Sequence, residues 1–309
     1  MPEKIIIDTD PGQDDAVALL LAFATRDRLD LVGITSVAGN VPVAQTSANV
    51  LRICELAGRE GMAVYAGAEG PLVYALETAE FVCGPDGLAG ADLPPPRGQV
   101  RAQHAVDFLI AYLLAAEDYS VTLCPLGPLT NIALALRLAP AIATRIQRIV
   151  LMGGAMNLGN ITPAAEFNFY VDPHAACIVF ESGIPLVMMG LHMTHQAIAS
   201  AAQVAAFGSM GNASGSAIHG MLTRPRPGGL GTTGHPMHDP CVIAFVLWPE
   251  LFTGRDCFVQ IDMTDGPVRG RSTIDWNGRL KKPANTFVTQ AVDAPTLFDR
   301  MIAEIATLP

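Results

Sequence analysis

The chain has 309 residues, of which 50% are apolar and only 16% are charged, and its formal net charge is −10. This composition is typical of a well-packed globular protein and excludes a disordered chain. The longest apolar run covers only residues 16–24, which excludes a transmembrane helix, and the lack of a Lys/Arg run excludes binding to the nucleic-acid backbone.

Short β-branched runs alternate with segments of helical periodicity along the first part of the chain. This alternation predicts an open, mostly parallel, Rossmann-like α/β sheet with helices on both faces. We expect strands at about residues 4–8, 31–37, 62–66, 120–125, 147–152 and 185–189. We expect helices at about residues 14–25, 43–57, 101–116, 128–138 and 173–182.

Two segments rich in Gly, Pro and Ser, residues 68–100 and 208–235, are predicted to be long and irregular. Such segments more often flank a binding site than fill space. The tail predicts a hairpin over residues 257–276 with its turn at Asp265-Gly266, then a strand near 286–291 and a closing helix from about 295. We expect a single domain over residues 1–309.

The cysteines and the N-terminus indicate the compartment. The six cysteines show no CxxC spacing, so we expect buried free thiols at Cys54, Cys83, Cys124, Cys177, Cys241 and Cys257. The N-terminal MPEKIII lacks the basic start and long apolar middle of a signal peptide, which favours the cytoplasm. With so little surface charge, a homo-oligomer that covers apolar area is expected.

In an open parallel sheet, ligands bind beyond the carboxyl ends of the strands. This rule selects four segments that each follow a predicted strand: DTDPGQDD (8–15), AGN (38–40), LGPLTN (126–131) and MGGAMNLGN (152–160). We expect these four loops to converge on one crevice.

The first of these loops concentrates four aspartates where the chain enters the core: Asp8, Asp10, Asp14 and Asp15. Asp14 or Asp15 could serve merely as the N-cap of the next helix, but that explains one carboxylate at most. Two carboxylates that point at one crevice repel each other unless a cation lies between them. We therefore predict a divalent metal site, although not an EF-hand, because Gly12 occupies the fifth position of such a loop.

The segment MHDPCVIAFVL (237–247) is a second candidate. Asp239 and Pro240 form a good N-cap and first-turn pair for an apolar helix. His238 lies directly before them on a Gly/Pro-rich approach, which places an acid and a titratable base together at a helix start. The similar Asp172, in YVDPHAA, is interpreted as structural.

The segment GNITPAAEFNFY (159–170) holds Asn160, Glu166 and Asn168 in a loop, where such residues are usually just solvated. The alternation with Phe167 and Phe169, however, indicates a semi-buried segment. Its polar groups would then face a ligand that needs hydrogen bonds, such as the hydroxyls of a sugar.

The segment GPLTNIALAL (127–136) reads as a turn into a helix capped by Thr130, and it contains no charged side chain. Any role at the crevice would have to come from backbone carbonyls, which suit a hard cation such as calcium.

With these motifs on one crevice, the chain resembles the nucleoside hydrolase family, the inosine-uridine-preferring N-ribohydrolases. The resemblance runs from about residue 5 to residue 290, and its most specific signature is DTDPGQDDAVAL. It implies an open α/β sheet, assembly as a homotetramer or homodimer, and a calcium ion at the floor of the pocket. It also implies hydrolysis of the N-glycosidic bond of ribonucleosides to free base and ribose.

The resemblance carries roles to individual residues. It implies calcium ligands at Asp10, Asp15, Asp239 and the backbone carbonyl of Leu126. It implies that the 2' and 3' hydroxyls of ribose are bound by Asp14, Asn168 and Asp239, and the 5' hydroxyl by Asn160 and Glu166. Two further residues, Asn40 and Met152, match pocket positions of the family.

The mechanism that the resemblance implies is chemically sensible. Calcium lowers the pKa of a bound water, Asp10 accepts its proton, and the hydroxide attacks the anomeric carbon. The carboxylates stabilise the oxocarbenium ion, and His238 protonates the leaving base or hydrogen-bonds to it. For Asp8 we expect only a structural hydrogen bond behind the pocket.

The chain departs from the family around the nucleobase. Cys83 stands where many members place a histidine, and residues 215–235 contain no tyrosine to stack on a base. The base preference is therefore open, although STIDWNGR (272–279) and GHPMHDPCVIAF (234–245) look more like bacterial pyrimidine-preferring members. Because of these departures, the alternative to a ribonucleoside hydrolase is a catalytically weak nucleoside- or pentose-binding protein on the same fold. A metal-dependent phosphatase is disfavoured, because no basic cluster or Gly-rich phosphate cradle is present.

Overall fold

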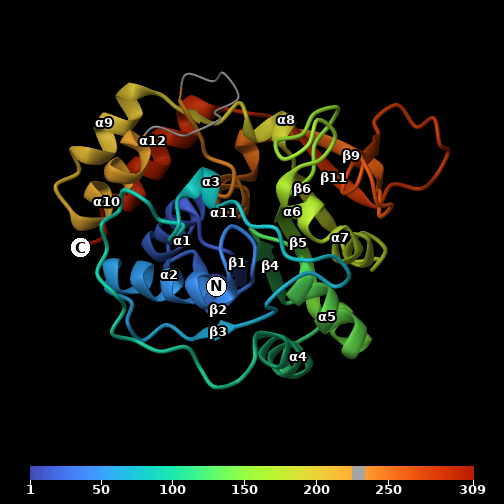
Figure 1. Ribbon diagram of the computed structural model, residues 1–309, viewed down its shortest axis with the longest axis horizontal. Helices are drawn as coiled ribbons and strands as arrows, with labels where there is room; N and C mark the ends of the chain where they lie inside the picture. Colours follow the sequence, from blue (N-terminus) through green and yellow to red (C-terminus); the bar gives the residue numbers. More distant parts are fainter. Residues whose placement is uncertain (225–233) are drawn as a thin grey trace.

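The computed structural model describes residues 1–224 and 234–309. Its centre is a nine-stranded sheet in the order β10-β9-β11-β6-β5-β4-β1-β2-β3 (Figure 1). Seven strands are mutually parallel: β1 (Glu3–Thr9), β2 (Leu29–Ser36), β3 (Val64–Ala66), β4 (Val121–Pro125), β5 (Ile146–Met152), β6 (Leu186–Met189) and β11 (Thr286–Val292). An antiparallel hairpin of β9 (Phe252–Ile261) and β10 (Ser272–Asp275) forms one edge. The predicted fold class and strands are confirmed.

The central strand β1 explains why the sequence begins with a continuous apolar run. Ile5 and Ile7 pack into the core on one face of the sheet, and Ile6 packs into the core on the other face. Successive side chains of a strand point to opposite faces, so a strand covered on both faces is apolar at every position.

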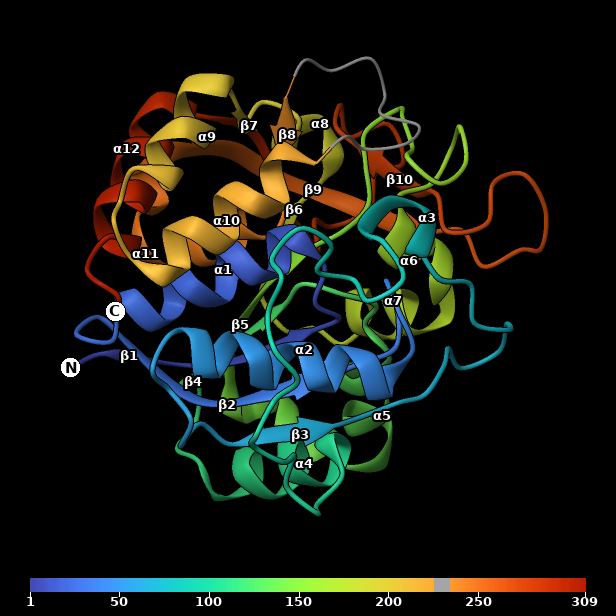
Figure 2. The same cartoon turned by 60° about the vertical axis from the view of Figure 1, so that its left-hand side comes forward.

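Helices cover both faces of the sheet, as the alternation predicts (Figure 2). One face carries α1 (Gln13–Ala24), α2 (Val43–Leu56), α9 (Ala201–Gly208), α10 (Ala213–Thr223), α11 (Pro240–Leu247) and α12 (Ala294–Ile305). The other carries α4 (Ala105–Ala115), α5 (Thr130–Leu138) and α7 (Pro173–Phe180). Shorter elements are α3 (Glu80–Cys83), α6 (Phe167–Val171), α8 (Leu191–Thr194), the 3-10 helices η1 (Pro140–Arg145) and η2 (Pro249–Leu251), and the antiparallel pair β7 (Ile198–Ala199) and β8 (His235–Pro236).

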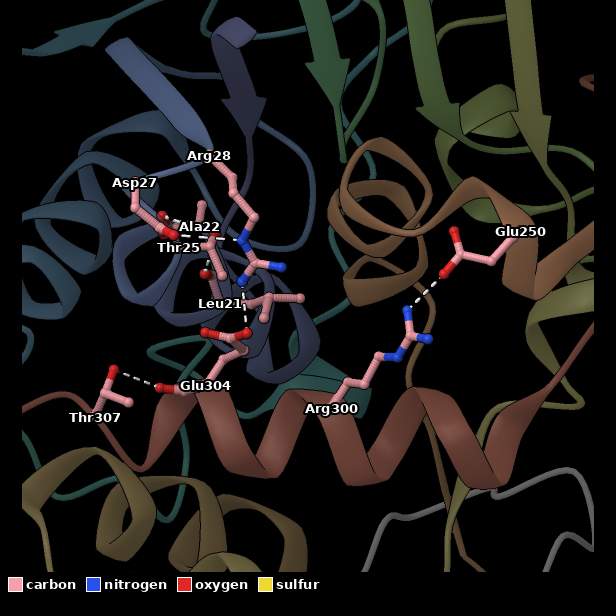
Figure 3. A network of polar contacts seen from close by, with 9 residues as sticks. All are labelled: Leu21, Ala22, Thr25, Asp27, Arg28, Glu250, Arg300, Glu304 and Thr307. Carbon is pink, nitrogen blue, oxygen red and sulfur yellow. Dashed lines mark hydrogen bonds and ion pairs between the residues drawn. The ribbon is translucent and has the colours of Figure 1, made fainter. Parts of the chain in front are cut away.

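The closing helix α12 is held mainly by its apolar face, which buries Leu297, Phe298, Met301 and Ile305. Two ion pairs flank this face (Figure 3): Arg28 donates to Glu304 at 2.5 Å, and Arg300 donates to Glu250 at 2.6 Å. Pairs this exposed are screened by solvent and contribute little, so packing decides the position of the helix.

Two sequence-based expectations need correction. The segment 208–235 is not irregular throughout, because α10 occupies Ala213–Thr223. The Ser and Gly residues of α10 form part of its buried face, where Ser214 and Gly215 lie beside Ile218 and Met221. Residues 225–233 lie outside the described residues. The predicted hairpin is present, but its connection covers residues 262–271 and is no tight turn at Asp265-Gly266.

The prediction for the cysteines is confirmed. All six cysteines are buried free thiols. Among the described residues, we find no helix with the length and apolar character needed to cross a membrane.

Candidate active site

The four loops that follow β1, β2, β4 and β5 meet at a cavity of about 440 Å³, as the strand-end rule predicts. Nine of the predicted site residues line it: Asp14, Asn40, Leu126, Met152, Asn160, Glu166, Asn168, His238 and Asp239. The other two, Asp10 and Asp15, are buried behind its wall, each with 1% of its surface exposed. A cavity of this size suits a small organic ligand.

Three carboxylates form a cluster at the floor. Asp14, Asp15 and Asp239 each place an oxygen within 4.8 Å of the other two. Asp15 is fixed from behind, because its carboxylate accepts hydrogen bonds from the Thr9 hydroxyl at 2.6 Å and the Gly12 backbone N–H at 2.9 Å. The N-cap of α1 is Gly12, so neither Asp14 nor Asp15 takes the capping position that the sequence left open.

Asp239 does occupy the N-cap position of α11, ahead of Pro240, as predicted. Its side chain makes no capping hydrogen bond, however. The Asp239 carboxylate lies instead with those of Asp14 and Asp15.

Asp10 is held rigidly beside this cluster. Its carboxylate accepts the Asn40 backbone N–H at 2.7 Å, and the Asn40 amide donates to the Asp10 carbonyl at 3.2 Å. A Cβ atom at Gly39 or at Gly127 would collide with the Asp10 carboxylate. The glycines of the AGN and LGPLTN loops therefore make room for this one side chain.

Burial and mutual repulsion dominate the electrostatics of the floor. Desolvation and the charges of neighbouring aspartates raise the pKa of Asp10 and of Asp239 well above the ordinary range, and raise the pKa of Asp15 to about 6. Within the described parts of the chain, no Lys or Arg forms an ion pair with these aspartates. The residues present therefore fit a hard cation with oxygen ligands.

Asn168 joins the ends of two strands. Its amide donates to the carbonyl of Leu126, after β4, at 2.7 Å and to the carbonyl of Met152, in β5, at 3.2 Å. A backbone carbonyl has two lone pairs, so the Leu126 oxygen can accept this bond and still coordinate a cation.

Glu166 anchors the start of α6. Its carboxylate accepts the backbone N–H groups of Gly154 at 2.9 Å, Asn168 at 2.8 Å and Phe169 at 3.2 Å. These donors lower the pKa of Glu166, but burial raises it by more, so that the pKa is about 7. Near neutral pH, Glu166 can therefore either donate or accept a hydrogen bond at the cavity surface.

The loop ahead of α6 is closed by Asn160, whose side-chain oxygen accepts the Phe167 backbone N–H at 2.9 Å. Phe167 and Phe169 are both buried. The predicted loop needs correction: Asn168 lies in the helix α6, and the polar and aromatic residues from Glu166 to Phe169 are all buried, whereas Asn160 is exposed.

Two imidazoles stand on another side of the cavity. The His238 Nδ1 lies 2.7 Å from the Thr194 hydroxyl, and the His195 ring lies 5.4 Å from the His238 ring, centroid to centroid. Sequence reasoning missed Thr194 and His195. They follow β6, whose carboxyl end lies at the same edge of the sheet, so the strand-end rule could have found them.

The outer wall is more apolar and comes from outside the sheet. It includes Phe81, Val82 and Cys83 of α3, together with Ile161 and Arg224. The Cys83 thiol donates to the Ala79 carbonyl at 3.1 Å, and burial raises its pKa to about 12. Cys83 therefore stays a neutral thiol near pH 7.

Asp8 has the structural hydrogen bonds expected of it. Its carboxylate accepts from the Thr35 hydroxyl at 2.5 Å and the Asn131 amide at 2.7 Å, and burial raises its pKa to about 7. Its second oxygen has no partner among the described residues.

Asp172 is structural, as predicted. It accepts the Thr130 hydroxyl at 2.7 Å and the Ala175 backbone N–H at 2.9 Å. Thr130 is thus the first residue of α5 rather than its cap, which is Leu129.

Comparisons with known proteins agree with this geometry. A family model described as inosine-uridine preferring nucleoside hydrolase matches residues 5–299. The chain is similar to an uncharacterized protein of Schizosaccharomyces pombe, at 46% identity over 99% of this chain and 100% of that protein. It is similar to the pyrimidine-specific ribonucleoside hydrolase RihB of Escherichia coli O157:H7, at 41% identity over 94% of this chain and 93% of that protein. It is also similar to the structure of a purine-preferring ribonucleoside hydrolase from Gardnerella vaginalis, with a TM-score of 0.89 and 31% identity over 98% of both chains.

Proposed function

The chain belongs to the inosine-uridine preferring nucleoside hydrolases and hydrolyses ribonucleosides, and from this premise we propose which of its residues perform each part of the reaction. The observation that carries the proposal is the buried carboxylate cluster at the floor of a cavity of ligand size.

We propose calcium as the cation and Asp10, Asp15, Asp239 and the Leu126 carbonyl as its ligands. Their support is chemical: all four offer oxygen, and the repulsion between the aspartates is relieved by a divalent ion. Asp14, which shares the cluster but is less buried than Asp15 and Asp239, would be left for the substrate. When bound, calcium supplies positive charge that keeps the carboxylates ionised and acidifies a water molecule.

The remaining cavity residues would bind ribose. We assign the 2' and 3' hydroxyls to Asp14, Asn168 and Asp239, and the 5' hydroxyl to Asn160 and Glu166. The support is that Asn160 and Glu166 line the cavity together with Asn168, and that burial raises the pKa of Glu166 to about 7. The walls beside the sugar would be formed by Asn40 and Met152.

Two residues would share the proton transfers of the chemical step, Asp10 on the water and His238 on the base. Asp10 takes a proton from the attacking water as the new bond from oxygen to C1' forms. The bond from C1' to the base nitrogen breaks with its electron pair going to the base, which takes a proton from His238. While positive charge is spread over the ribose ring, the carboxylates of Asp14 and Asp239 stabilise it.

We further propose that pyrimidine ribonucleosides are preferred. The relative named as pyrimidine-specific is 41% identical to this chain, and the structure named as purine-preferring is 31% identical. We also propose a single domain over residues 1–309 that works in the cytoplasm as a homodimer or homotetramer. One sheet with both core layers packed on it supports the single domain, and the low share of charged residues supports the oligomer.

The test is to incubate the purified protein with inosine, uridine and cytidine, with and without calcium, and to assay reducing sugar. We expect ribose from all three nucleosides with calcium, fastest from the two pyrimidines. Absence of ribose from every nucleoside would overturn the proposal. Tight binding of nucleoside by calorimetry without release of base would favour a binding protein instead.

A further inference from the structure

The hairpin at the edge of the sheet reaches the cavity walls without lining the cavity. Its connection, residues 262–271, carries Arg269, which is only 8% exposed. The Arg269 guanidinium lies 3.7 Å from the ring centre of Tyr170 and 4.4 Å from that of Tyr74. It also donates to the Glu77 carboxylate at 2.6 Å. We call Arg269, Tyr74, Glu77 and Tyr170 the arginine clamp.

The members of the clamp also bind one another. The Tyr170 hydroxyl donates to the Glu77 carboxylate, with distances of 3.1 and 3.2 Å to its two oxygens. The Tyr74 hydroxyl donates to the Met263 carbonyl in the hairpin connection at 3.0 Å. Residues far apart in the sequence are therefore joined around one cation, with Arg269 at the centre.

The clamp connects two walls of the cavity. Tyr170 belongs to α6, which also carries Asn168 at the floor. Glu77 precedes α3, which carries Phe81 in the outer wall. Arg269 thus bridges the segment that holds the sugar side and the segment that leads to the base side.

The two sides depend on the clamp to different degrees. The helix α6 has independent supports, because Glu166 caps it and a Cβ at Gly270, where φ is +76°, would lie 2.5 Å from the Tyr170 Cα. By contrast, among the described residues, Tyr74 and Glu77 make the hydrogen bonds of residues 73–78, and Leu76 adds an apolar contact with the cluster that α3 shares with α6. Loss of Arg269 should therefore loosen the approach to α3, which keeps only this apolar contact, and leave α6 in place.

We propose that Arg269 is a positioning residue that sets the outer wall against the sugar-binding floor and so determines how well the nucleobase fits. This inference rests on the proposed function, because it assumes that the base occupies the outer half of the cavity. A planar guanidinium can stack on two rings and still bind a carboxylate, whereas the ammonium of lysine cannot keep all three contacts.

The test compares Arg269→Met and Arg269→Lys with the control Arg255→Met. Arg255 lies in the same hairpin, covers Trp276 at 4.2 Å and donates to the Trp276 carbonyl at 3.1 Å, and it is not among the described residues that line the cavity. For Arg269→Met we expect the KM for uridine to rise about tenfold, kcat to stay within about threefold, and inhibition by free ribose to be unchanged. Arg269→Lys should be intermediate, and Arg255→Met should match the wild type.

An unchanged KM in Arg269→Met would overturn the inference, as would an equal loss of affinity for ribose, because that would indicate general loosening. Calorimetric titration of each variant with uridine and with ribose separates this from failure of the proposed function. If the wild type binds uridine but releases no base, the proposed function fails and the clamp is judged on the affinities alone. If the wild type binds neither ligand, both fail.

A double-mutant cycle with Glu77→Ala tests the connection itself. If Arg269 acts through Glu77, the double variant should have about the same KM as either single variant. Independent, multiplicative effects would contradict the clamp.

Discussion

The floor and the outer wall of the cavity are built in opposite ways. At the floor, Asp10, Glu166 and Asn168 are 1%, 2% and 6% exposed, and backbone groups at the ends of parallel strands fix them. In the outer wall, Phe81 is 59% exposed and comes from a four-residue helix in a long loop. The difference indicates a division of labour, in which a rigid scaffold positions the bond-breaking groups and peripheral loops select the base.

The largest expected effect belongs to the floor. Asp10→Asn should lower kcat by about a thousandfold or more, equally for every nucleoside, because a proton acceptor is lost and no base contact changes. Steady-state kinetics on uridine, cytidine and inosine measure this. Asp172→Asn is a control of equal burial away from the cavity, and it should lower the melting temperature while kcat is retained. A near-normal rate in Asp10→Asn would remove Asp10 from the reaction.

The second largest effect belongs to His238: His238→Ala should produce a loss that depends on the leaving group. We expect about a hundredfold loss for uridine, whose base needs a proton, and less than about threefold for a nitrophenyl riboside, whose phenolate leaves unaided. Thr194→Val should fall between, since its hydroxyl contacts the His238 Nδ1 at 2.7 Å. Equal losses on both substrates would mean that His238 positions substrate and transfers no proton.

The floor should also couple stability to pH. The pKa of Asp15 is raised from 3.8 to about 6, so between these values the folded, calcium-free protein binds more protons than the unfolded chain. Its free energy of unfolding should therefore fall as pH rises through this window, and the raised pKa values of Asp10 and Asp239 act in the same direction.

Calcium should reverse this loss. At about 100 times its Kd, calcium should add about 2.7 kcal/mol near pH 7, and it should add less at pH 5, where protons compete for the carboxylates. Scanning calorimetry at both pH values, with and without calcium, checks this. Equal stabilisation at both would argue against these aspartates as ligands.

The smallest expected effect belongs to the outer wall. Phe81→Ala should raise the KM for nucleosides about fivefold through lost stacking, with kcat and ribose inhibition unchanged. Leu138→Ala, an equally exposed apolar residue on α5 away from the cavity, should change none of these values. A fall in kcat in Phe81→Ala would contradict the proposal that the outer wall contributes only to binding of the base.

The same distinction explains what the sequence could predict. The parallel sheet follows from apolar runs such as Ile5–Ile7, and the floor follows from polar groups placed directly after such runs. The helix α10 has no clear signal in the sequence, because Gly and Ser usually indicate turns. In α10, Ser214 and Gly215 are buried and allow close packing instead.

The outer wall and the clamp escaped prediction for a different reason. Phe81 carries no local signal, and Arg269 meets Glu77 across 192 positions of sequence. Contacts of this kind arise only from tertiary packing. Likewise, only the family resemblance joins Asp239 to Asp10 and Asp15 as a metal ligand, because no local pattern brings Asp239 within 4.8 Å of Asp14 and Asp15.

The claim that the floor recognises ribose itself is tested most directly by comparing kcat/KM for uridine and 2'-deoxyuridine. The base is identical, so the outer wall contributes equally, and only the hydroxyl assigned to the floor carboxylates differs. We expect uridine to be favoured by about a hundredfold or more, because the deoxy substrate leaves buried polar groups without a partner. Equal values for the two substrates would contradict the account.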